Sequence, residues 1–467
     1  RLSIVGRAGV GVDNVDVAEA TRRGVVVVNV PDGNTLAAAE HTFALMLAMV
    51  RQLPAADAAL RAGRWERHRV GVQLFGKTLG VVGMGRIGRQ VALRALAFGM
   101  RVLGYDPYLG AGAGAGDVRL VGLEELLAEA DIVTVHTPLT PQTRHLLGAR
   151  ELARMKPGAY VVNCARGGIV DEAALAAALG EGRLAGAALD VWEEEPPGPD
   201  HPLLRLENVV ATPHLGASTV EAQRLNAETV AEELVRWFAG KPVRNAVNLP
   251  PLSEEEWMAV RPFLGLATVL GPFFVQALPT RLEQVSIGLA LQGRAAELVA
   301  SAVLAGLLGA VLNSPLNLVN AAAVAAEQGV HWELRSERDG LAPQEVSLEA
   351  GPPGARRRLR ARLDPDGRAR IVALDDFPID LVPTPHMLLS RHADRPGIVG
   401  RLGSILGERG VNIAEMRLGR RAPGGEAVMV LGTDQPVDDA TVAALAGIEP
   451  VEEIRRIELG AWLEAAT

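Results

Sequence analysis

The stretch "GKTLGVVGMGRIGRQVA" (residues 76–92) determines the fold of the first half of this chain. Its apolar run "TLGVVG" is typical of a strand, and it leads into the pattern Gly83-x-Gly85-x-x-Gly88, at which a helical pattern begins. Gly83 permits a tight turn, Gly85 lets a pyrophosphate approach the backbone, and Gly88 lets the helix lie close to the strand. Free N–H groups at the start of such a helix face the phosphates. The stretch therefore predicts a dinucleotide-binding strand, turn and helix.

The residue that ends the next strand indicates which dinucleotide binds. The run "RVLGY" (101–105) is followed by Asp106, whose carboxylate can hold the ribose hydroxyls of the cofactor. The same negative charge repels a 2′-phosphate, so the sequence favours NAD over NADP. The alternative interpretation is a glycine-rich turn of an α/β sheet that binds no cofactor. The strand, the helix and Asp106 around the glycines argue against that alternative.

Apolar runs and helical patterns alternate on both sides of this stretch. Strands are expected at residues 25–30, 78–83, 101–105, 131–136, 159–163, 185–190 and 208–212, and helices at 34–53, 86–99, 123–130, 171–180 and 218–239. Such alternation is typical of parallel strands joined by crossover helices. The strands are apolar on both faces, as expected when helices cover both sides of a sheet. The predicted fold class is α/β, with a doubly wound parallel sheet.

The sequence changes character after residue 250. Residues 251–383 are first rich in Ala and Leu and then mixed, whereas residues 385–467 follow the order βαββαβ, which predicts a ferredoxin-like domain. The run "LVASAVLAGLLGAVL" (298–312) carries no charge. It is shorter than the ~20 apolar residues that a membrane-spanning helix needs. We therefore expect buried helices of a globular domain there.

Composition limits the function further. The chain has 467 residues, so two to four domains are expected, and its net charge of −8 argues against a general nucleic-acid binder. Its one cysteine, Cys164, allows no internal disulfide and excludes a cysteine-rich metal site. A reducing cytoplasm is the compartment that fits this count. We expect no metal.

Two side chains follow predicted strands at the edge where ligands bind. Arg166, in "NCARGGIVDE", follows one strand, and His214, in "TPHLGAST", follows another. In open α/β sheets, ligands lie beyond the carboxyl ends of the strands. There Arg166 can bind a carboxylate with its two-pronged guanidinium, or it can pair at the surface with Asp171 or Glu172. His214 can act as a general acid or base if a carboxylate reaches it.

The acidic run "WEEEPP" could supply that carboxylate. Glu193, Glu194 and Glu195 are consecutive, and an acidic run fits a solvated loop as well as a catalytic role. His201 lies close to this run in the sequence, and so does His214. The residues alone leave open which glutamate has a role.

The motifs together resemble a known family. "GRAGVGVDNVD", "GMGRIG", "VHTPLTPQTRHLL", "NCARGGIVDE", "ALDVWEEEPP" and "TPHLGAST" closely resemble the D-2-hydroxyacid dehydrogenases, and the resemblance runs from residue 1 to the C-terminus. The chain is similar to the longer members of this family, which have an additional intervening regulatory domain and an ACT domain. The implied domains are a remnant of a second α/β, substrate-binding domain (1–31 and 214–247), an NAD-binding Rossmann-like domain (32–213), an intervening α+β domain (248–383) and a ferredoxin-like ACT domain (384–467).

The family pattern assigns the catalytic residues. In this family the catalytic glutamate lies five residues after the Asp of "DVW", which makes Asp190 that Asp and Glu195 the glutamate. The resemblance implies that Glu195 orients and charges His214, and that Arg166 binds the carboxylate and carbonyl of the substrate. The neighbours without such a role are Glu193 and Glu194, expected to be solvated, and His201, expected to be a loop residue.

The resemblance also implies the contacts of NAD. They come from the glycine motif, from Asp106 and from the loops at the carboxyl ends of the other strands. The expected cofactor-binding residues are Val10, Gly83, Gly85, Arg86, Ile87, Gly88, Asp106, Thr137, Pro138, Cys164, Ala165, Arg166, Asp190, His214, Gly216 and Ala217. Cys164 is then a small residue beside the nicotinamide pocket and not a nucleophile.

The stretch "MLLSRHADRPGIVGRLGSILGERGVNIAEM" resembles the start of an ACT domain. Positions that bind serine in regulated family members correspond to His392, Asp394 and Asn412. The middle position is often Asn, so Asp394 is a departure that could keep an ammonium contact but loses a donor. L-serine is the effector that the resemblance implies, and an ACT domain used only for assembly is the alternative.

Members with these added domains oxidise 3-phospho-D-glycerate to 3-phosphohydroxypyruvate with NAD, at the start of L-serine biosynthesis, and a homodimer or homotetramer is the implied assembly. One alternative is another family reductase, acting on glyoxylate or hydroxypyruvate. A second is an NAD-sensing binding protein of the same fold. Family members also have strands before the start of this sequence that carry part of the phosphate site. A third alternative is therefore a shortened chain that binds NAD without turnover.

Overall fold

The computed structural model describes residues 2–109, 117–312, 316–336 and 341–466. The chain forms two compact units. One consists of Ala8–Val10 and Val30–Thr229, and the other of Arg1–Arg7, Gly11–Asn29 and Val230–Thr467. The first unit extends to Thr229, whereas the sequence prediction assigns residues 214–247 to another domain. The finer division into four domains stays a prediction.

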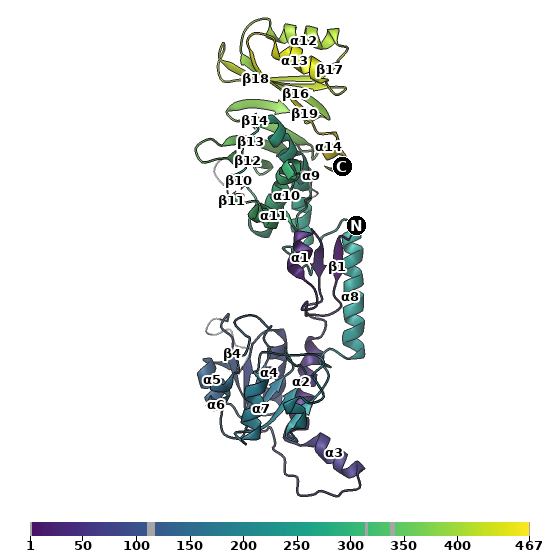
Figure 1. The fold of residues 1–467 in the computed structure, drawn as a ribbon, viewed down its shortest axis with the longest axis vertical. Helices are drawn as coiled ribbons and strands as arrows, with labels where there is room; N and C mark the ends of the chain where they lie inside the picture. The colour runs from purple at the N-terminus through teal and green to yellow at the C-terminus, as the bar shows by residue number, and fades with distance from the viewer. Residues whose placement is uncertain (1, 110–116, 313–315, 337–340, 467) are drawn as a thin grey trace. The chain divides into compact units, whose positions relative to one another are not determined.

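The unit of residues 30–229, drawn in purple-blue to teal in Figure 1, is built on a parallel sheet. The sheet has seven strands in the order β5-β4-β3-β6-β7-β8-β9. Its strands are β3 (Thr78–Val82), β4 (Arg101–Tyr105), β5 (Arg119–Leu120), β6 (Ile132–Val135), β7 (Ala159–Asn163), β8 (Leu184–Leu189) and β9 (Val209–Ala211). The predicted parallel sheet is confirmed. The sequence pattern did not indicate β5, which is a two-residue edge strand.

Helices cover both faces of this sheet, and the side chains of its central strands are therefore buried on both faces. Each face packs against its own apolar cluster. One cluster lies between the sheet and α2 and α4, and the other lies between the sheet and α5, α6 and α7. The helices are α2 (Thr35–Val50), α3 (Leu53–Arg61), α4 (Arg86–Ala97), α5 (Leu123–Glu129), α6 (Ala149–Arg154) and α7 (Glu172–Gly180), with a 3-10 turn at Pro202–Arg205. Helix α8 (Val220–Phe238) begins in this unit and ends in the other.

The helix predicted at 34–53 is shorter in the structure. Helix α2 ends at Val50, and Gln52 adopts a left-handed conformation with φ +54°. Pro54 lies at the start of the next helix, α3, where its missing N–H costs no hydrogen bond. A proline in the interior of one long helix would lose that bond, so the chain turns at Gln52 and starts again.

The second unit begins with a small parallel pair, β1 (Ile4–Gly6) and β2 (Val26–Val28), joined by α1 (Val17–Arg22). The side chain of Asn248, 221 positions after Val27 in the sequence, holds β2 and α1. It accepts the N–H of Val27 at 2.9 Å and donates to the hydroxyl of Thr21 at 3.0 Å. Residues distant in sequence therefore complete this layer.

The middle of the second unit is a six-stranded sheet of order β11-β10-β12-β13-β14-β15. Its strands are β10 (Gln284–Leu289), β11 (His331–Ser336), β12 (Glu345–Gly351), β13 (Arg357–Leu363), β14 (Ala369–Leu374) and β15 (Phe377–Leu381), and its helices are α9 (Glu254–Ala277), α10 (Gly293–Leu312) and α11 (Ala321–Glu327). Helices α9 and α10 touch through glycine, since a Cβ on Gly271 would lie 2.1 Å from the backbone N of Leu307.

Both α9 and α10 are long and apolar enough to cross a membrane, and α2 with α3 would qualify as one bent pair. In α9 and α10, 56% and 67% of the apolar window is buried inside the protein. The buried side chains belong to one core that also contains the inner face of the six-stranded sheet. The packing supports the prediction that the run 298–312 is a buried helix.

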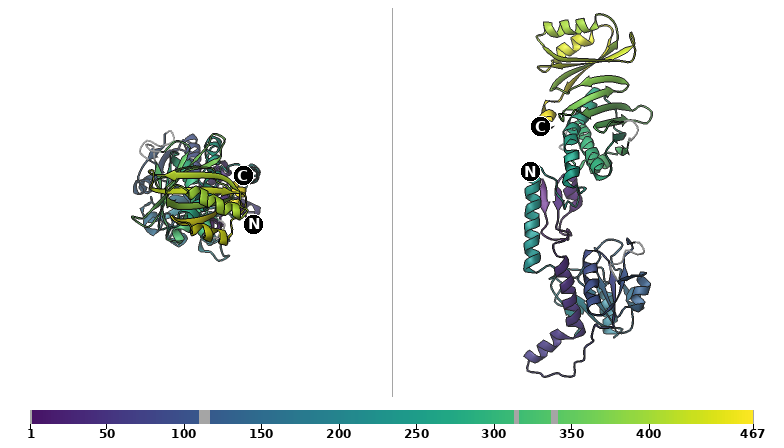
Figure 2. Two further views of the ribbon diagram at one scale, coloured as in Figure 1. Left: turned by 90° about the horizontal axis from the view of Figure 1, so that it is seen from above. Right: turned by 180° about the vertical axis from the view of Figure 1, so that it is seen from behind.

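The C-terminal part is a four-stranded antiparallel sheet of order β17-β18-β16-β19, with α12 and α13 on one face (Figure 2). Its elements are β16 (His386–Ala393), α12 (Ile398–Glu408), β17 (Ile413–Arg420), β18 (Glu426–Thr433), α13 (Asp439–Ala446), β19 (Val451–Glu458) and α14 (Gly460–Ala466). The predicted βαββαβ order is confirmed. Gln276 of α9 exchanges two hydrogen bonds with the backbone of Glu458, at 2.8 and 3.1 Å, and so links this sheet to α9.

Candidate active site

The three motif glycines have the geometry that the sequence predicts. Gly83 has φ +96°, and a Cβ there would lie 2.5 Å from the carbonyl oxygen of His136. A Cβ on Gly88 would lie 2.0 Å from the carbonyl oxygen of Gly83, so strand and helix touch through their backbones. Around Gly85, which precedes the first residue of α4, a Cβ would meet nothing within 4 Å. That open space leaves room for a ligand at the helix start.

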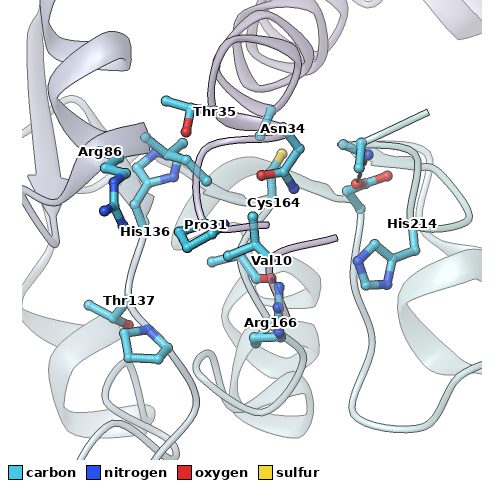
Figure 3. Close-up of a pocket in the computed structure, with 17 residues that line it drawn as sticks. Val10, Pro31, Asn34, Thr35, Arg86, His136, Thr137, Cys164, Arg166 and His214 are labelled. Atoms are coloured by element: carbon cyan, nitrogen blue, oxygen red, sulfur yellow. Dashed lines mark hydrogen bonds between the residues drawn. The ribbon is translucent and has the colours of Figure 1, made fainter. Parts of the chain in front are cut away.

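A cavity of about 250 Å³ lies at the carboxyl ends of the strands. Arg86, His136 and Thr137 line one side and His214 the other, with Arg166 between them (Figure 3). The predicted residues that line it are Val10, Arg86, Ile87, Thr137, Pro138, Cys164, Ala165, Arg166, Asp190, His214, Gly216 and Ala217. The predicted residues that do not line it are Gly83, Gly85, Gly88, Asp106 and Glu195.

Five lining residues were not predicted: Pro31, Asn34, Thr35, Ala38 and His136. Four of them belong to the turn before α2 and to its first residues, and no pattern in the sequence indicated that this helix lies beside the glycine motif. Within the described part of the chain, the Oδ1 of Asn34, the hydroxyl of Thr35, the Nδ1 of His136 and the hydroxyl of Thr137 are buried without a hydrogen-bond partner. Buried polar atoms are normally bonded, so these atoms suit a polar ligand such as a dinucleotide.

Asp106 follows β4, where the motif predicts the ribose-binding carboxylate. One oxygen accepts the backbone N–H of Met84 at 3.0 Å and the other that of Tyr108 at 3.0 Å. These bonds fix the carboxylate beside the glycine turn. Each oxygen keeps a free lone pair, so the ribose hydroxyls of NAD could still donate to it.

Glu195 and His214 form a direct pair. The Nδ1 of His214 lies 2.8 Å from Oε2 of Glu195, and the N–H of Trp192 donates to the other oxygen of Glu195 at 3.2 Å. His214 has φ +57°, a conformation that non-glycine residues rarely adopt, and its own N–H donates to the carbonyl of Asp190 at 2.8 Å. Such strained residues concentrate at functional sites.

Asp190 holds the loop that carries His214. Its Oδ1 accepts from the hydroxyl of Thr212 at 2.5 Å, from the N–H of Leu215 at 2.7 Å and from Nε2 of His41 at 3.1 Å. Its Oδ2 accepts the N–H of Gly216 at 2.8 Å. Burial works to raise the pKa of Asp190, but the hydrogen bonds from His41, Thr212 and Leu215 outweigh it and hold the pKa below its usual value. The sequence indicated Asp190 but not His41.

Arg166 lies in a loop that is held by hydrogen bonds to Asn163. Buried Asn163, the last residue of β7, donates to the carbonyl of Arg166 at 2.9 Å and accepts the N–H of Ala165 at 3.0 Å. A Cβ on Gly167 would lie 1.7 Å from the carbonyl oxygen of Trp192, so the loop of Arg166 and the loop of Glu195 touch through their backbones. The side chain of Arg166 lines the cavity, where its guanidinium can hold a carboxylate.

Burial sets the protonation of two further lining residues. It raises the pKa of Cys164 to about 12, so the thiol stays protonated, which agrees with the expectation that it is not a nucleophile. It lowers the pKa of His136 to about 4, so this imidazole is neutral near pH 7. The Nε2 of His136 lies 3.0 Å from the hydroxyl of Thr134.

Glu193 is exposed, as predicted, but it also bonds to neighbouring loops, which the sequence did not indicate. Its Oε1 lies 3.1 Å from Nε2 of His145, and its N–H donates to the carboxylate of Glu172 at 2.6 Å. His201 is likewise bonded, with Nε2 2.9 Å from the other oxygen of Glu172. Glu194 is exposed, as expected. The sequence could not show these contacts, because they join loops that are distant along the chain.

Each of the three predicted effector residues already has a local hydrogen-bond partner within the chain. His392 is only 2% exposed and its Nδ1 lies 3.1 Å from the hydroxyl of Ser390. Asp394 pairs with Arg420 at 3.0 Å and accepts a backbone N–H. Asn412 donates to Asp434 at 2.6 Å. We therefore keep only Asp394 and Asn412 in the proposed effector site.

Comparison with family models identifies three domains. Residues 43–216 match the D-isomer specific 2-hydroxyacid dehydrogenase, NAD binding domain. Residues 259–375 match the D-3-phosphoglycerate dehydrogenase intervening domain, and residues 386–450 match the ACT domain. The cofactor of the first domain is therefore NAD, and the geometry of Gly85, Asp106 and the unpartnered polar atoms suits it.

Individual proteins match over almost the whole chain. A D-3-phosphoglycerate dehydrogenase of Methanocaldococcus jannaschii is 41% identical over 464 residues, which are 98% of this chain and 88% of that protein. One of Bacillus subtilis is 42% identical over 470 residues, with the same two coverages. The crystal structure of a glyoxylate reductase from Paecilomyes thermophila covers 52% of this chain and 75% of its own, with 36% identity and a TM-score of 0.50. The chain belongs to the D-isomer specific 2-hydroxyacid dehydrogenases, in the group of the D-3-phosphoglycerate dehydrogenases.

Proposed function

We propose that this chain oxidises 3-phospho-D-glycerate to 3-phosphohydroxypyruvate with NAD, which is the first step of L-serine biosynthesis. The observation that carries the proposal is the pair of Glu195 and His214, 2.8 Å apart, of which His214 lines the same cavity as Arg166. Oxidation of a hydroxy acid needs a group that takes the hydroxyl proton and a group that holds the carboxylate. His214 and Arg166 supply these two functions.

One nitrogen of His214 is the proposed proton acceptor. Because Nδ1 faces Glu195, Nε2 is the nitrogen left to take the hydroxyl proton of the substrate. Glu195 then stabilises the imidazolium that forms. Arg166 binds the substrate carboxylate and so brings the carbon that bears the hydroxyl toward the cavity. NAD, held by the residues that line the cavity, would supply the hydride acceptor for that carbon.

The proposal is tested by following NADH formation with 3-phospho-D-glycerate and with NAD as the only oxidant. D-lactate, D-glycerate and glycolate serve as competing substrates, and glyoxylate and hydroxypyruvate with NADH test the reverse direction. We expect the highest kcat/KM with the phosphorylated substrate. A preference for glyoxylate or hydroxypyruvate would instead support a reductase like the structural relative of the NAD domain. Cofactor binding without turnover of any of these acids would support an NAD-sensing protein or a shortened, inactive chain.

The ACT domain implies control by a small effector, and L-serine, the end product of the pathway, is the one that we propose. Its ammonium would need Asp394 and the side-chain carbonyl of Asn412, and its carboxylate would need N–H groups at the start of α12. In the single chain, Asp394 is already paired with Arg420. Serine must therefore displace or share that pair, and a second ACT domain could supply the missing contacts.

Calorimetry of the full chain with L-serine tests this part. We expect heat at millimolar serine in the wild type and a clear loss in the Asp394→Ala variant. Asp366→Asn, in an exposed turn outside the ACT domain, is the matched control. Absence of heat in the wild type would leave the ACT domain as an assembly module.

We also propose that the chain is a cytoplasmic homodimer or homotetramer. The support for an assembly is a series of exposed apolar side chains on α3 and the segment after it: Leu53, Leu60, Trp65, Val70 and Phe75. Trp65 is 78% exposed, which is unusual for a large apolar residue unless a partner covers it. Light scattering during gel filtration gives the mass, and a monomer at micromolar concentration would contradict the proposal.

A further inference from the structure

Two glutamates connect the loop of residues 193–195, which we call the acidic loop, to the start of α7. Glu172 Oε1 accepts the backbone N–H of Glu193 at 2.6 Å, and Glu193 Oε1 accepts the backbone N–H of Glu172 at 3.3 Å. Each carboxylate thus holds the main chain of the other residue. The second oxygen of Glu172 accepts from Nε2 of His201 at 2.9 Å, and Glu193 Oε1 lies 3.1 Å from Nε2 of His145. We name these four residues the loop clasp.

The loop clasp joins three loops at the carboxyl ends of the strands. His145 belongs to the loop after β6, Glu172 follows the loop after β7, and Glu193 and His201 belong to the segment after β8. His145 has φ +51°, and its N–H donates to the carbonyl of Gly168 at 2.7 Å. The loop after β7 carries Arg166 and the segment after β8 carries Glu195. The clasp therefore connects the two loops that place the substrate carboxylate and the acid–base pair.

The residues of the loop clasp interact through charges and hydrogen bonds rather than through apolar packing. The side chain of Glu172 is 12% exposed, and burial raises its pKa although the N–H of Glu193 and His201 act to lower it. The charged and titratable groups around it are Glu193, His201, His145 and Asp171, whose carboxylate lies 3.7 Å from Nδ1 of His145. The two glutamates repel each other, and the histidines offset that repulsion. The spacing of the loops therefore depends on the positions of these groups.

Trp192 connects the loop clasp to the acid–base pair through hydrogen bonds. It directly precedes Glu193, and its N–H donates to Glu195 at 3.2 Å. Its indole N–H donates at 3.3 Å to the carbonyl of Thr212, two residues before His214. A displacement of Glu193 would therefore move the donor that orients Glu195.

We propose that Glu172 is a positioning residue of the acid–base pair: its carboxylate fixes the Glu195 loop to the Arg166 loop, so that Glu195 stays on Nδ1 of His214. This inference rests on the proposed function, because it gives Glu172 its role through the pair that takes the substrate proton. Glu172 itself does not line the cavity.

A double-mutant cycle with Glu195 tests the inference. We expect Glu172→Ala to lower kcat/KM ~10-fold, because misplacing a reacting group by a fraction of an ångström has effects of this order. In the Glu195→Gln background the same change should cost less than ~2-fold, because residues that act through one another are not additive. An equal loss in both backgrounds would show that Glu172 acts independently of Glu195 and would overturn the proposal.

Two further variants separate positioning from loss of folding. Glu172→Gln keeps an oxygen that can accept the N–H of Glu193, so it should restore at least half of the wild-type kcat/KM. Glu181→Gln, an exposed change at the other end of α7, should leave kcat/KM unchanged. NADH affinity should stay within ~2-fold of wild type in all three variants, since no residue of the loop clasp lines the cavity. If Glu172→Gln lost as much as Glu172→Ala, the acceptor role would be wrong.

A readout that needs no turnover distinguishes failure of this inference from failure of the proposed function. The ¹⁵N chemical shifts of the ring of His214, assigned by their loss in His214→Ala, report which nitrogen carries the proton. We expect the Nδ1–H form in the wild type and in Glu172→Gln, and a shift toward the Nε2–H form in Glu172→Ala and Glu195→Gln. An unchanged His214 signal in Glu172→Ala, beside a changed one in Glu195→Gln, would overturn the positioning role even if no substrate is turned over.

Discussion

The NAD-binding unit and the ACT domain differ in how far their predicted residues come together. In the first, twelve predicted residues line one cavity, and Glu195 bonds directly to His214. In the second, Asp394 and Asn412 are each bonded to a different local partner, Arg420 and Asp434. The carboxyl ends of parallel strands meet at one edge of a sheet, so one chain assembles the cavity. No such rule gathers the ACT residues, and their site would need groups from elsewhere.

The largest effect is expected from His214→Ala. It should lower kcat ~10²–10⁴-fold, because a general acid–base group is lost, and leave NADH affinity nearly intact. Stopped-flow absorbance and NADH fluorescence measure the two quantities, and His331→Ala, an exposed histidine of the other unit, is the control. Heat from L-serine should also be unchanged, which would sharpen the contrast between the two regions. A residual activity near that of the wild type would exclude His214 as the proton acceptor.

Glu195→Gln should have the next largest effect. A hydrogen bond to a charged group contributes ~1.5–3 kcal/mol, so kcat/KM should fall roughly 10- to 100-fold. The acidic limb of the pH–rate profile for oxidation should move to lower pH, because the imidazolium loses its carboxylate partner. Glu194→Gln, which changes an exposed side chain, is the control and should have little effect. If Glu194 proved the sensitive position, the register of the acidic loop would be wrong.

Asp106 should determine cofactor choice within the cavity region. Fluorescence titration should show tighter binding of NADH than of NADPH, and Asp106→Ala should weaken NADH binding ~10-fold while reducing that preference, since hydrogen bonds to its charge are worth ~1.5 kcal/mol. Asp117→Ala changes an exposed aspartate of the same unit and should alter neither affinity. Equal affinity of the wild type for NADH and NADPH would contradict the role of Asp106.

The smallest effect concerns stability. The pKa of Asp190 is held below its usual value, so its contribution to stability is present above the pKa of an unfolded Asp, ~3.9, and is lost as pH falls through the lower folded pKa. Asp190→Asn should therefore lower the unfolding midpoint of the NAD-binding unit at pH 7, by roughly 2–4 °C per kcal/mol lost. The difference from wild type should shrink toward pH 3. A constant difference across pH would show that packing, not charge, is responsible.

The sequence predicted the sheet, the glycine turn and the ACT order because each has a local signature: alternating elements, three spaced glycines and a βαββαβ pattern. The pairing of Glu195 with His214 came from the family resemblance, since spacing alone left three glutamates open. Other contacts had no local signal. His41 on α2 reaches Asp190 across 149 positions, and the bonds among Glu172, Glu193 and His145 join separate loops. The turn at Gln52 also escaped, because one left-handed residue leaves little trace in an apolar helical pattern.

Because Cys164 is buried, its reactivity can be used to follow how accessible the cavity wall is in solution. Cys164 is the one cysteine of the sequence, and burial keeps its thiol protonated beside the cofactor cavity. The residue lines the cavity but is only 8% exposed, so a maleimide or disulfide reagent should react with it slowly, and faster when the surrounding strand ends open transiently. The rate of labelling under native conditions therefore reports how accessible the cavity wall is, without any introduced probe. Bound NADH should slow that rate, whereas L-serine would slow or accelerate it only if the ACT domain communicates with the cavity.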